Sequence, residues 1–238
     1  MIIIVIFLII GLIIYFKRKK SKNSFADNSR INIPSSSNII ESTEQCFDDN
    51  IGTLLKKATE LKKNGNIDSA IETLKLAYSE IKKTNTTYPI NTFLRLPLYL
   101  QEAKRNDEAW KEFNNLLSQG YPNYDIDQEV WPAEEGIIYD KMRLFLQREG
   151  KHNLAISFGI FSHLKWTIAL YKQKRNEELK SYQNKNEISE MLKPLLKKAM
   201  KDDLLSELVE LVSNETANPS KINIAEVKKN IAEILKDK

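Results

Sequence analysis

The stretch "LLKKATELKKNGNIDSAIETLKLAYSEI", residues 54–81, decides the fold. Its first half places apolar and small side chains at helical spacing, and Gly65 then ends the pattern. Glycine commonly ends a helix because it tolerates left-handed backbone dihedrals, and Asn66 is a favoured residue just before a new helix. The second half predicts that helix, with Ala70 and Ala77 on the face that meets the first one. Small residues let two helices approach closely, so the stretch predicts a helical hairpin.

The same layout returns in two further stretches. "FLRLPLYLQEAKRNDEAWKEFNNLL" covers residues 93–117, and "YDKMRLFLQREGKHNLAISFGIFSHLKW" covers residues 139–166. Each stretch has apolar residues at helical spacing, a polar turn and a second helix with an alanine near its start. The alanines Ala70, Ala109 and Ala155 are 39 and 46 residues apart. Three hairpins with one internal layout indicate a repeated structural unit.

These hairpins resemble the tetratricopeptide repeat (TPR) family. The first copy matches the family pattern of large, small and turn positions at Leu54, Ala58, Leu61, Gly65, Ala70, Leu74 and Ala77. The other copies depart from it, because Pro97 and Arg143 stand where a small residue is usual and Lys104 replaces the glycine. The resemblance implies an all-α solenoid of stacked TPR-like hairpins over residues 47–168. An irregular helical bundle is the alternative.

The segment after residue 168 loses the repeat but keeps helical periodicity. We expect residues 169–238 to form a helical extension that caps the stack. Its last helix begins at Asn223 and Glu226, which have the spacing of a capping box. The apolar stripe of that helix consists of Ile224, Val227, Ile231 and Leu235.

The N-terminus reads "MIIIVIFLIIGLIIYFKRKKSK", and residues 1–16 carry no charged side chain. As a helix they span roughly 24 Å, somewhat less than a bilayer core, and flanking lysines can make up part of the difference. A cleaved signal peptide would place positive charge before the apolar stretch and small residues after it. The order here is the reverse, which favours a transmembrane anchor over a signal peptide or a buried core helix.

The basic residues behind the anchor predict its orientation. Positive charge stays on the cytoplasmic side of a membrane, so we expect a single-pass protein whose helical domain is cytoplasmic. Residues 17–46 then form a basic flank and a flexible linker rich in Ser and Asn. The topogenic residues are Lys17, Arg18, Lys19, Lys20 and Lys22.

Charge and cysteine content exclude several functions. The net charge is +4, but residues 1–46 hold six basic and three acidic residues, which leaves 30 basic and 29 acidic residues in the rest. A nearly neutral domain does not predict nucleic-acid binding. Cys46 is the single cysteine, so neither an internal disulfide nor a zinc site built on several cysteines can form.

Catalytic and metal-binding motifs are missing from the sequence. It contains no phosphate-binding glycine loop, nucleophile elbow or His-Glu-x-x-His motif. His152 and His163 lack metal-ligand spacing, and we interpret them as surface or packing residues. Residues 123–134 space acidic side chains somewhat like a calcium loop, but Gln128 stands where the loop needs glycine, so an acidic loop between repeats is the better interpretation. We therefore predict neither a cofactor nor an enzymatic activity.

The resemblance implies a partner-binding surface on the first helices of the hairpins. Thr59 and Leu98 occupy places where peptide-clamping family members carry Asn or a basic residue, so capture of a C-terminal carboxylate is not expected. A helix or an extended segment with apolar anchors fits the mixed surface better. The candidates for contact with an unidentified protein or peptide are Leu55, Thr59, Lys62, Leu94, Leu98, Gln101, Leu144, Gln147 and Arg148.

Two functions remain open at this point. The favoured one is a membrane-anchored interaction module, a scaffold or adaptor. The alternative is an envelope assembly or quality-control factor whose helical domain lies on the non-cytoplasmic side. A basic stripe at Lys193, Lys197 and Lys201, spaced by four residues, could in addition lie on a membrane, although a solvated helix face explains it as well.

Overall fold

The computed structural model describes residues 45–124 and 129–236, and for residues 45–49 it describes the backbone alone. The chain divides after Cys46 into two units. The fold is that of residues 47–238, together with Gln45 and Cys46, which begin the first described helix. The predicted anchor, the topogenic residues from Lys17 to Lys22 and nearly all of the linker lie outside the described residues. Gln45 and Cys46, which we assigned to the linker, already belong to the first described helix.

Every regular element of the described residues is helical, so the prediction of an all-α fold is confirmed for this part of the chain. The α-helices are α2 (Gln45–Lys63), α3 (Ile67–Ile81), α4 (Ile90–Phe93), α5 (Arg95–Glu102), α6 (Asn106–Gln119), α7 (Trp131–Arg148), α8 (His152–Lys172), α9 (Asn176–Tyr182), α10 (Lys185–Ala199), α11 (Leu205–Thr216) and α12 (Ile224–Lys236). Short 3₁₀ turns, η1 (Asp202–Leu204) and η2 (Pro219–Lys221), precede α11 and α12.

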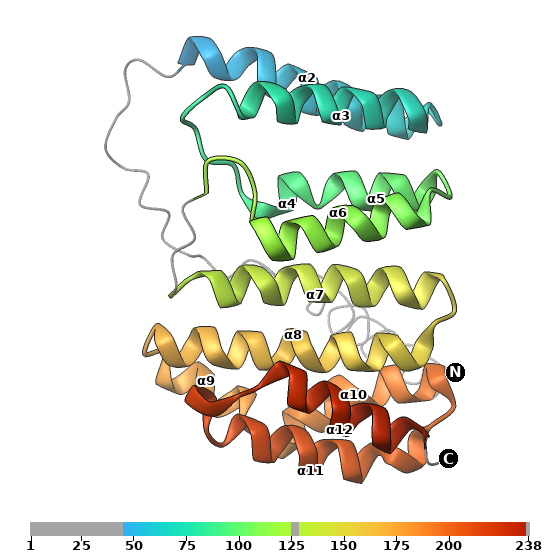
Figure 1. The fold of residues 1–238 in the computed structure, drawn as a ribbon, viewed down its shortest axis with the longest axis vertical. Helices are drawn as coiled ribbons and strands as arrows, with labels where there is room; N and C mark the ends of the chain where they lie inside the picture. Colours follow the sequence, from blue (N-terminus) through green and yellow to red (C-terminus); the bar gives the residue numbers. More distant parts are fainter. Residues whose placement is uncertain (1–44, 125–128, 237–238) are drawn as a thin grey trace, which may run out of the picture. The chain divides into compact units, whose positions relative to one another are not determined.

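The three predicted hairpins are formed by α2–α3, α5–α6 and α7–α8, and Figure 1 shows them stacked in chain order. The small residues lie where the helices meet, since Ala58, Ala70 and Ala109 are fully buried. One hydrophobic core joins the hairpins, and it includes Ile71, Leu74, Phe113 and Met142 among its buried members. A larger side chain at these fully buried positions would push the paired helices apart, because protein interiors are close-packed.

One turn conformation joins the helices of all three hairpins. Gly65, Lys104 and Gly150 have φ angles of 79°, 62° and 71°. Each N–H donates to the carbonyl three residues back, and the following N–H donates to the carbonyl five residues back, as in a Schellman motif. The replacement of glycine by Lys104 therefore does not change the turn, although a left-handed non-glycine residue costs about 1 kcal/mol. Asn66 precedes α3 as expected, but its side chain makes no capping hydrogen bond.

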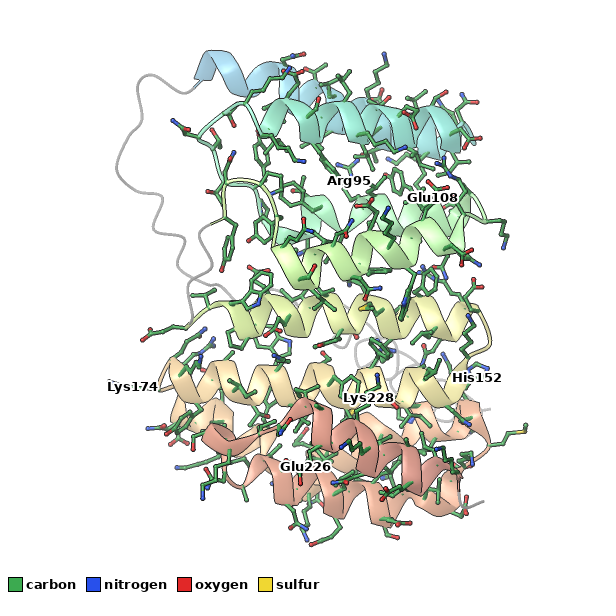
Figure 2. All side chains as sticks on the ribbon, viewed as in Figure 1. Arg95, Glu108, His152, Lys174, Glu226 and Lys228 are labelled. Carbon is green, nitrogen blue, oxygen red and sulfur yellow. The ribbon has the colours of Figure 1, made fainter. Side chains whose placement is uncertain are left out.

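A fourth turn of this kind joins α8 to α9 and was missed by the sequence analysis. Lys174 has a φ of 56°, and the same pair of backbone hydrogen bonds closes the turn. Figure 2 shows Lys174 and His152 at opposite ends of α8. The signal was present in the sequence, because Lys-Arg-Asn occurs at residues 104–106 and again at residues 174–176.

Pro97 explains why the first helix of the second hairpin is divided. A proline ring clashes with the carbonyl four residues earlier, which here belongs to Phe93. Helix α4 ends at Phe93 and α5 begins at Arg95, so Pro97 falls in the first turn of α5, where its missing N–H costs nothing. In the third hairpin Arg143 stands where a small residue is usual, and Gly159 on the partner helix α8 leaves the space that its side chain needs. A Cβ on Gly159 would lie 3.2 Å from Cδ of Arg143 and 2.6 Å from Cδ1 of Leu195.

The third hairpin is longer than predicted at both ends. Helix α7 already begins at Trp131, so the last residues of the stretch interpreted as an acidic loop, 123–134, are helical. Pro132 stands at the start of α7, where its fixed φ favours helix initiation. Helix α8 continues to Lys172 and therefore past the predicted end of the repeats at residue 168.

A second hydrophobic core lies between α8 and the C-terminal helices. It combines residues of α8, α10, α11 and α12, and its buried members include Ile160, Leu196, Leu208, Val227 and Ile231. Helix α8 contributes to both cores, because Ala155 belongs to the first. Among the described residues α8 is also the one helix long and apolar enough to cross a membrane, but more than half of its apolar stretch is buried inside the protein.

Two details of the C-terminal helices differ from the sequence analysis or refine it. Helix α10 ends at Ala199 and Met200 turns the chain with a left-handed φ of 56°, so Lys201 does not extend the stripe of Lys193 and Lys197. The Nζ of Lys201 instead donates to the carbonyl of Leu235. Before α12, the side chain of Asn223 accepts hydrogen bonds from the backbone N–H groups of Ala225 and Glu226, which is the Asn223 half of the predicted capping box.

Candidate protein-interaction surface

The first helices of successive hairpins contact one another through polar side chains. Arg95, at the start of α5, donates through Nη2 to the carbonyl of Leu55 and to the hydroxyl of Thr59 on α2, both at 2.8 Å. One end of α5 is thereby joined to α2, and Figure 2 shows Arg95 in the space between these hairpins. At the other end Lys62 forms a 2.9 Å ion pair with Glu102. Helices α2 and α5 therefore share one polar seam.

The seam continues from α5 to α7 through Gln101. Its Nε2 donates to the carbonyl of Phe145 at 3.0 Å, and its Oε1 accepts from Nη1 of Arg148 at 3.0 Å. Both ends of this buried amide are satisfied, so Gln101 holds the two helices in register. Arg148 itself is an exposed residue.

Helix α10 adds a fourth member to the row. Nζ of Lys198 lies 3.4 Å from Oε1 of Gln147, and Gln147 also accepts from Nη1 of Arg143 at 3.3 Å. Arg143 is held in turn by Asp140, at 2.6 Å. We use the term first-helix face for the side chains that line this row on α2, α5, α7 and α10: Leu55, Thr59, Lys62, Arg95, Leu98, Glu102, Asp140, Arg143, Leu144, Gln147, Arg148 and Lys198.

Seven of the nine predicted contact residues retain exposed area on the first-helix face. Arg148 is exposed, and the half-buried ones are Leu55, Thr59, Lys62, Leu98, Leu144 and Gln147.

Two predicted contacts, Leu94 and Gln101, are wrong, because only 1% and 6% of their surface is exposed. Leu94 lies at the break between α4 and α5. Its predicted exposure assumed one uninterrupted helix before the turn, so the prediction fails where the helix is broken. Gln101 is covered by α7.

Five members of the face were missed by the sequence analysis as contact residues: Arg95, Glu102, Asp140, Arg143 and Lys198. Arg95 and Glu102 flank the predicted positions on α5, and Lys198 comes from outside the repeats. Nothing local distinguishes Lys198 from its neighbour Lys197. Its place on the face follows from how α10 packs, which no periodicity within α10 reveals.

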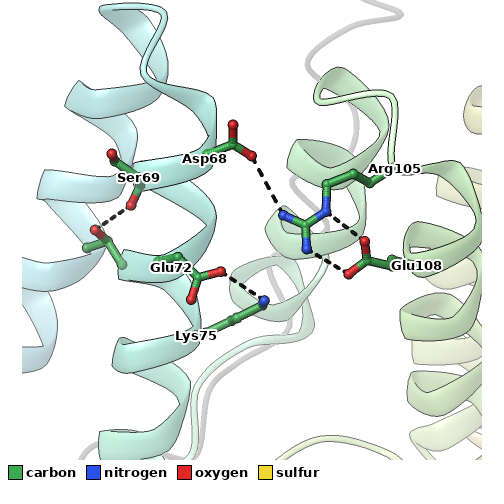
Figure 3. A network of polar contacts seen from close by, with 7 residues as sticks. Asp68, Ser69, Glu72, Lys75, Arg105 and Glu108 are labelled. Atoms are coloured by element: carbon green, nitrogen blue, oxygen red, sulfur yellow. Dashed lines mark hydrogen bonds and ion pairs between the residues drawn. The ribbon is translucent and has the colours of Figure 1, made fainter.

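The second helices carry a separate polar network, shown in Figure 3. Arg105, in the turn before α6, donates through Nε to Glu108 at 2.7 Å and lies 3.7 Å from Asp68 on α3. The hydrogen bond from Arg105 lowers the pKa of the Glu108 carboxyl. Arg175 and Glu178 repeat this pair in the turn before α9, with a 3.1 Å bond from Nε. Since these groups are exposed, the network positions turns and adds little stability.

Two buried titratable groups lie away from the first-helix face. Burial lowers the pKa of His163 to about 4, and its Nε2 is 2.8 Å from the carbonyl of Tyr182, so the ring is neutral and packs as expected. Burial raises the pKa of Glu134 to about 7, and a hydrogen bond from Tyr121 opposes part of that rise. Neither group lies among a set of metal-ligating side chains in the described residues.

Residues 123–134, whose acidic side chains are spaced somewhat like a calcium loop, show no calcium site among their described members. The side-chain amide of Asn123 donates to the carbonyls of Ile81 at 2.7 Å and Thr86 at 3.0 Å. It therefore ties the loop to the preceding hairpin. Asp125 and Asp127 lie outside the described residues.

Comparison with known proteins gives no match: no family model, no curated protein and no solved structure matches this chain.

Proposed function

We propose that this chain is a membrane-anchored, TPR-like interaction module that binds a protein or peptide on the first-helix face and carries out no catalysis. The observation that supports this function is the row itself, in which the first helices of three hairpins and α10 bring polar and apolar side chains together. Stacked hairpins of this kind form solenoids that offer extended binding surfaces. The C-terminal helices α9 to α12 then cap the solenoid.

The apolar residues of the face suit a partner with apolar anchors. Leu55 and Leu98 are half-buried and pack against the first core, so part of each side chain is still open to a partner. Leu144 is half-buried and belongs to neither core, which makes it the residue whose substitution should disturb the fold least.

Site-specific photo-crosslinking in cells tests this function. A photoreactive amino acid at Gln147 or Lys62 should give discrete protein adducts, whereas one at Lys111 on the second helix α6 should give none. Leu144→Glu, combined with the probe at Gln147, should reduce the adduct about tenfold while far-UV circular dichroism stays unchanged, because a charge would displace an apolar anchor. Equal adducts from Gln147 and Lys111, or none from Gln147 and Lys62, would contradict an interaction surface here.

The compartment of the domain distinguishes the favoured function from the alternative. We propose that the domain is cytoplasmic, since the basic flank from Lys17 to Lys22 follows the apolar segment. Cys46, the single thiol, serves as a built-in probe for a membrane-impermeant maleimide. Protection in intact cells with labelling after permeabilisation is expected. Labelling of intact cells would reverse the topology and favour the envelope assembly or quality-control factor.

A further inference from the structure

Cations outnumber carboxylates on the first-helix face. The cations are Lys62, Arg95, Arg143, Arg148 and Lys198. The carboxylates are Glu102 and Asp140, and Glu149 lies beside them, with its Oε1 3.4 Å from Nε2 of Gln101. Glu102 and Asp140 form ion pairs with two of these cations, Glu102 with Lys62 at 2.9 Å and Asp140 with Arg143 at 2.6 Å. Asp140 also lies 3.8 Å from Lys141, so its charge is shared. The face therefore carries net positive charge on a domain that is nearly neutral as a whole.

Three cations of the face form no ion pair among the described residues, although Arg95 also lies over the ring of Tyr99, 5.8 Å from its centroid. Arg95 donates to a backbone carbonyl and a hydroxyl, Arg148 to the amide of Gln101, and Lys198 to the amide of Gln147. Neutral acceptors orient these side chains without compensating their charge. Each guanidinium also has more donors than these bonds use. The side chains are thus positioned for a further, anionic acceptor.

The helix dipole accounts for only part of this arrangement. Lys62, Arg148 and Lys198 lie in the last turns of their helices, where the dipole favours positive charge. Arg95 lies at the start of α5, where the dipole disfavours it. The dipole therefore does not explain Arg95, which lies at the opposite end of α5 from Lys62 and is held by its hydrogen bonds to Leu55 and Thr59 on α2.

We propose that the first-helix face binds an acidic segment whose carboxylates alternate with apolar residues, the carboxylates contacting Arg95, Arg148 and Lys198 and the apolar side chains contacting Leu98 and Leu144. This partner class rests on the proposed function and narrows it. Opposite charge steers such a segment to the face and fixes its register, and the binding weakens as salt screens the cations.

A peptide selection on the full chain tests the proposal. The protein is reconstituted in nanodiscs of uncharged lipid, a random library of displayed peptides is selected on it, and peptides that also bind empty nanodiscs are removed. The recovered peptides should carry net negative charge with interspersed apolar residues. The double variant Arg148→Glu/Lys198→Glu should recover basic peptides instead, because it reverses the charge of the row.

One recovered peptide then gives the affinity. Its Kd should rise about tenfold in Arg148→Glu/Lys198→Glu, since each exposed charge contributes roughly a threefold change. The control Lys111→Glu/Lys228→Glu has the same net charge but changes exposed lysines of α6 and α12, and its Kd should stay within about twofold. Recovery of neutral or basic peptides by the unmodified chain, or an equal loss in the control, would overturn the acidic partner but leave the interaction module. Recovery of no peptide would overturn both.

Discussion

Phe113→Ala should lower the free energy of unfolding by about 4 kcal/mol, because it removes the largest fully buried side chain of the first core. Phe113 lies on α6 and meets Phe145 of α7 edge to face, with ring centroids 5.9 Å apart. Alanine would lose the buried apolar surface and leave a cavity between two hairpins. Such aromatic pairs also add about 1 kcal/mol beyond the buried area. Urea denaturation followed by circular dichroism measures the loss.

Leu76→Ala is the matched control for this experiment. Leu76 is a large apolar residue of the adjoining second helix, α3, but half of its surface is exposed. Its truncation should change the free energy of unfolding by less than about 0.5 kcal/mol, since surface substitutions rarely cost more. A cost for Phe113→Ala below about 1.5 kcal/mol would mean that the hairpins do not share the tightly packed core described above.

The hairpins could be predicted from sequence because their determinants are local. Buried alanines at Ala70, Ala109 and Ala155 and left-handed turns at Gly65 and Gly150 all act within a few residues of their own position. Such signals survive in a single sequence, and the structure places them where the pattern requires.

The features that were not predicted depend on tertiary contacts or on a turn sequence without the usual glycine. The turn at Lys174 was missed because it has neither a glycine nor a following alanine, as Leu179 stands in that place. Gln101 was assigned to the surface by counting along one helix, but the neighbouring helix α7 covers it. Lys198 joins the first-helix face only through the packing of α10. A surface formed by four helices is therefore only partly predictable from the periodicity of each.

Lys165→Met should lower the free energy of unfolding by about 3 kcal/mol, since it leaves a largely buried carboxylate without its partner. Nζ of Lys165 on α8 lies 2.6 Å from Oε2 of Glu135 on α7, and the two side chains are only 17% and 15% exposed. The desolvation cost of Glu135 would remain after the compensating cation is gone. We place the effect at the low end for buried pairs because some water still reaches both groups.

The double variant Glu135→Leu/Lys165→Met completes a double-mutant cycle. It should recover most of the loss, because replacing both members of a buried pair with apolar residues of similar size is often neutral. Chemical denaturation of the four proteins then gives the coupling energy, which should be at least about 1.5 kcal/mol. Equal losses in the single and double variants would show that Lys165 stabilises α8 by packing of its methylene groups and not by its charge.

The position of α8 between two cores has a consequence for protein synthesis. Each hairpin of the first core contacts its neighbours in sequence, so it can fold soon after it leaves the ribosome. The second face of α8 is different, because it is covered by residues of α10, α11 and α12, which are all made after α8. Until then the nascent chain exposes a helix apolar enough to enter a bilayer. A chain truncated after Lys172 would keep that face exposed, and we expect it to bind chaperones more than the full chain does.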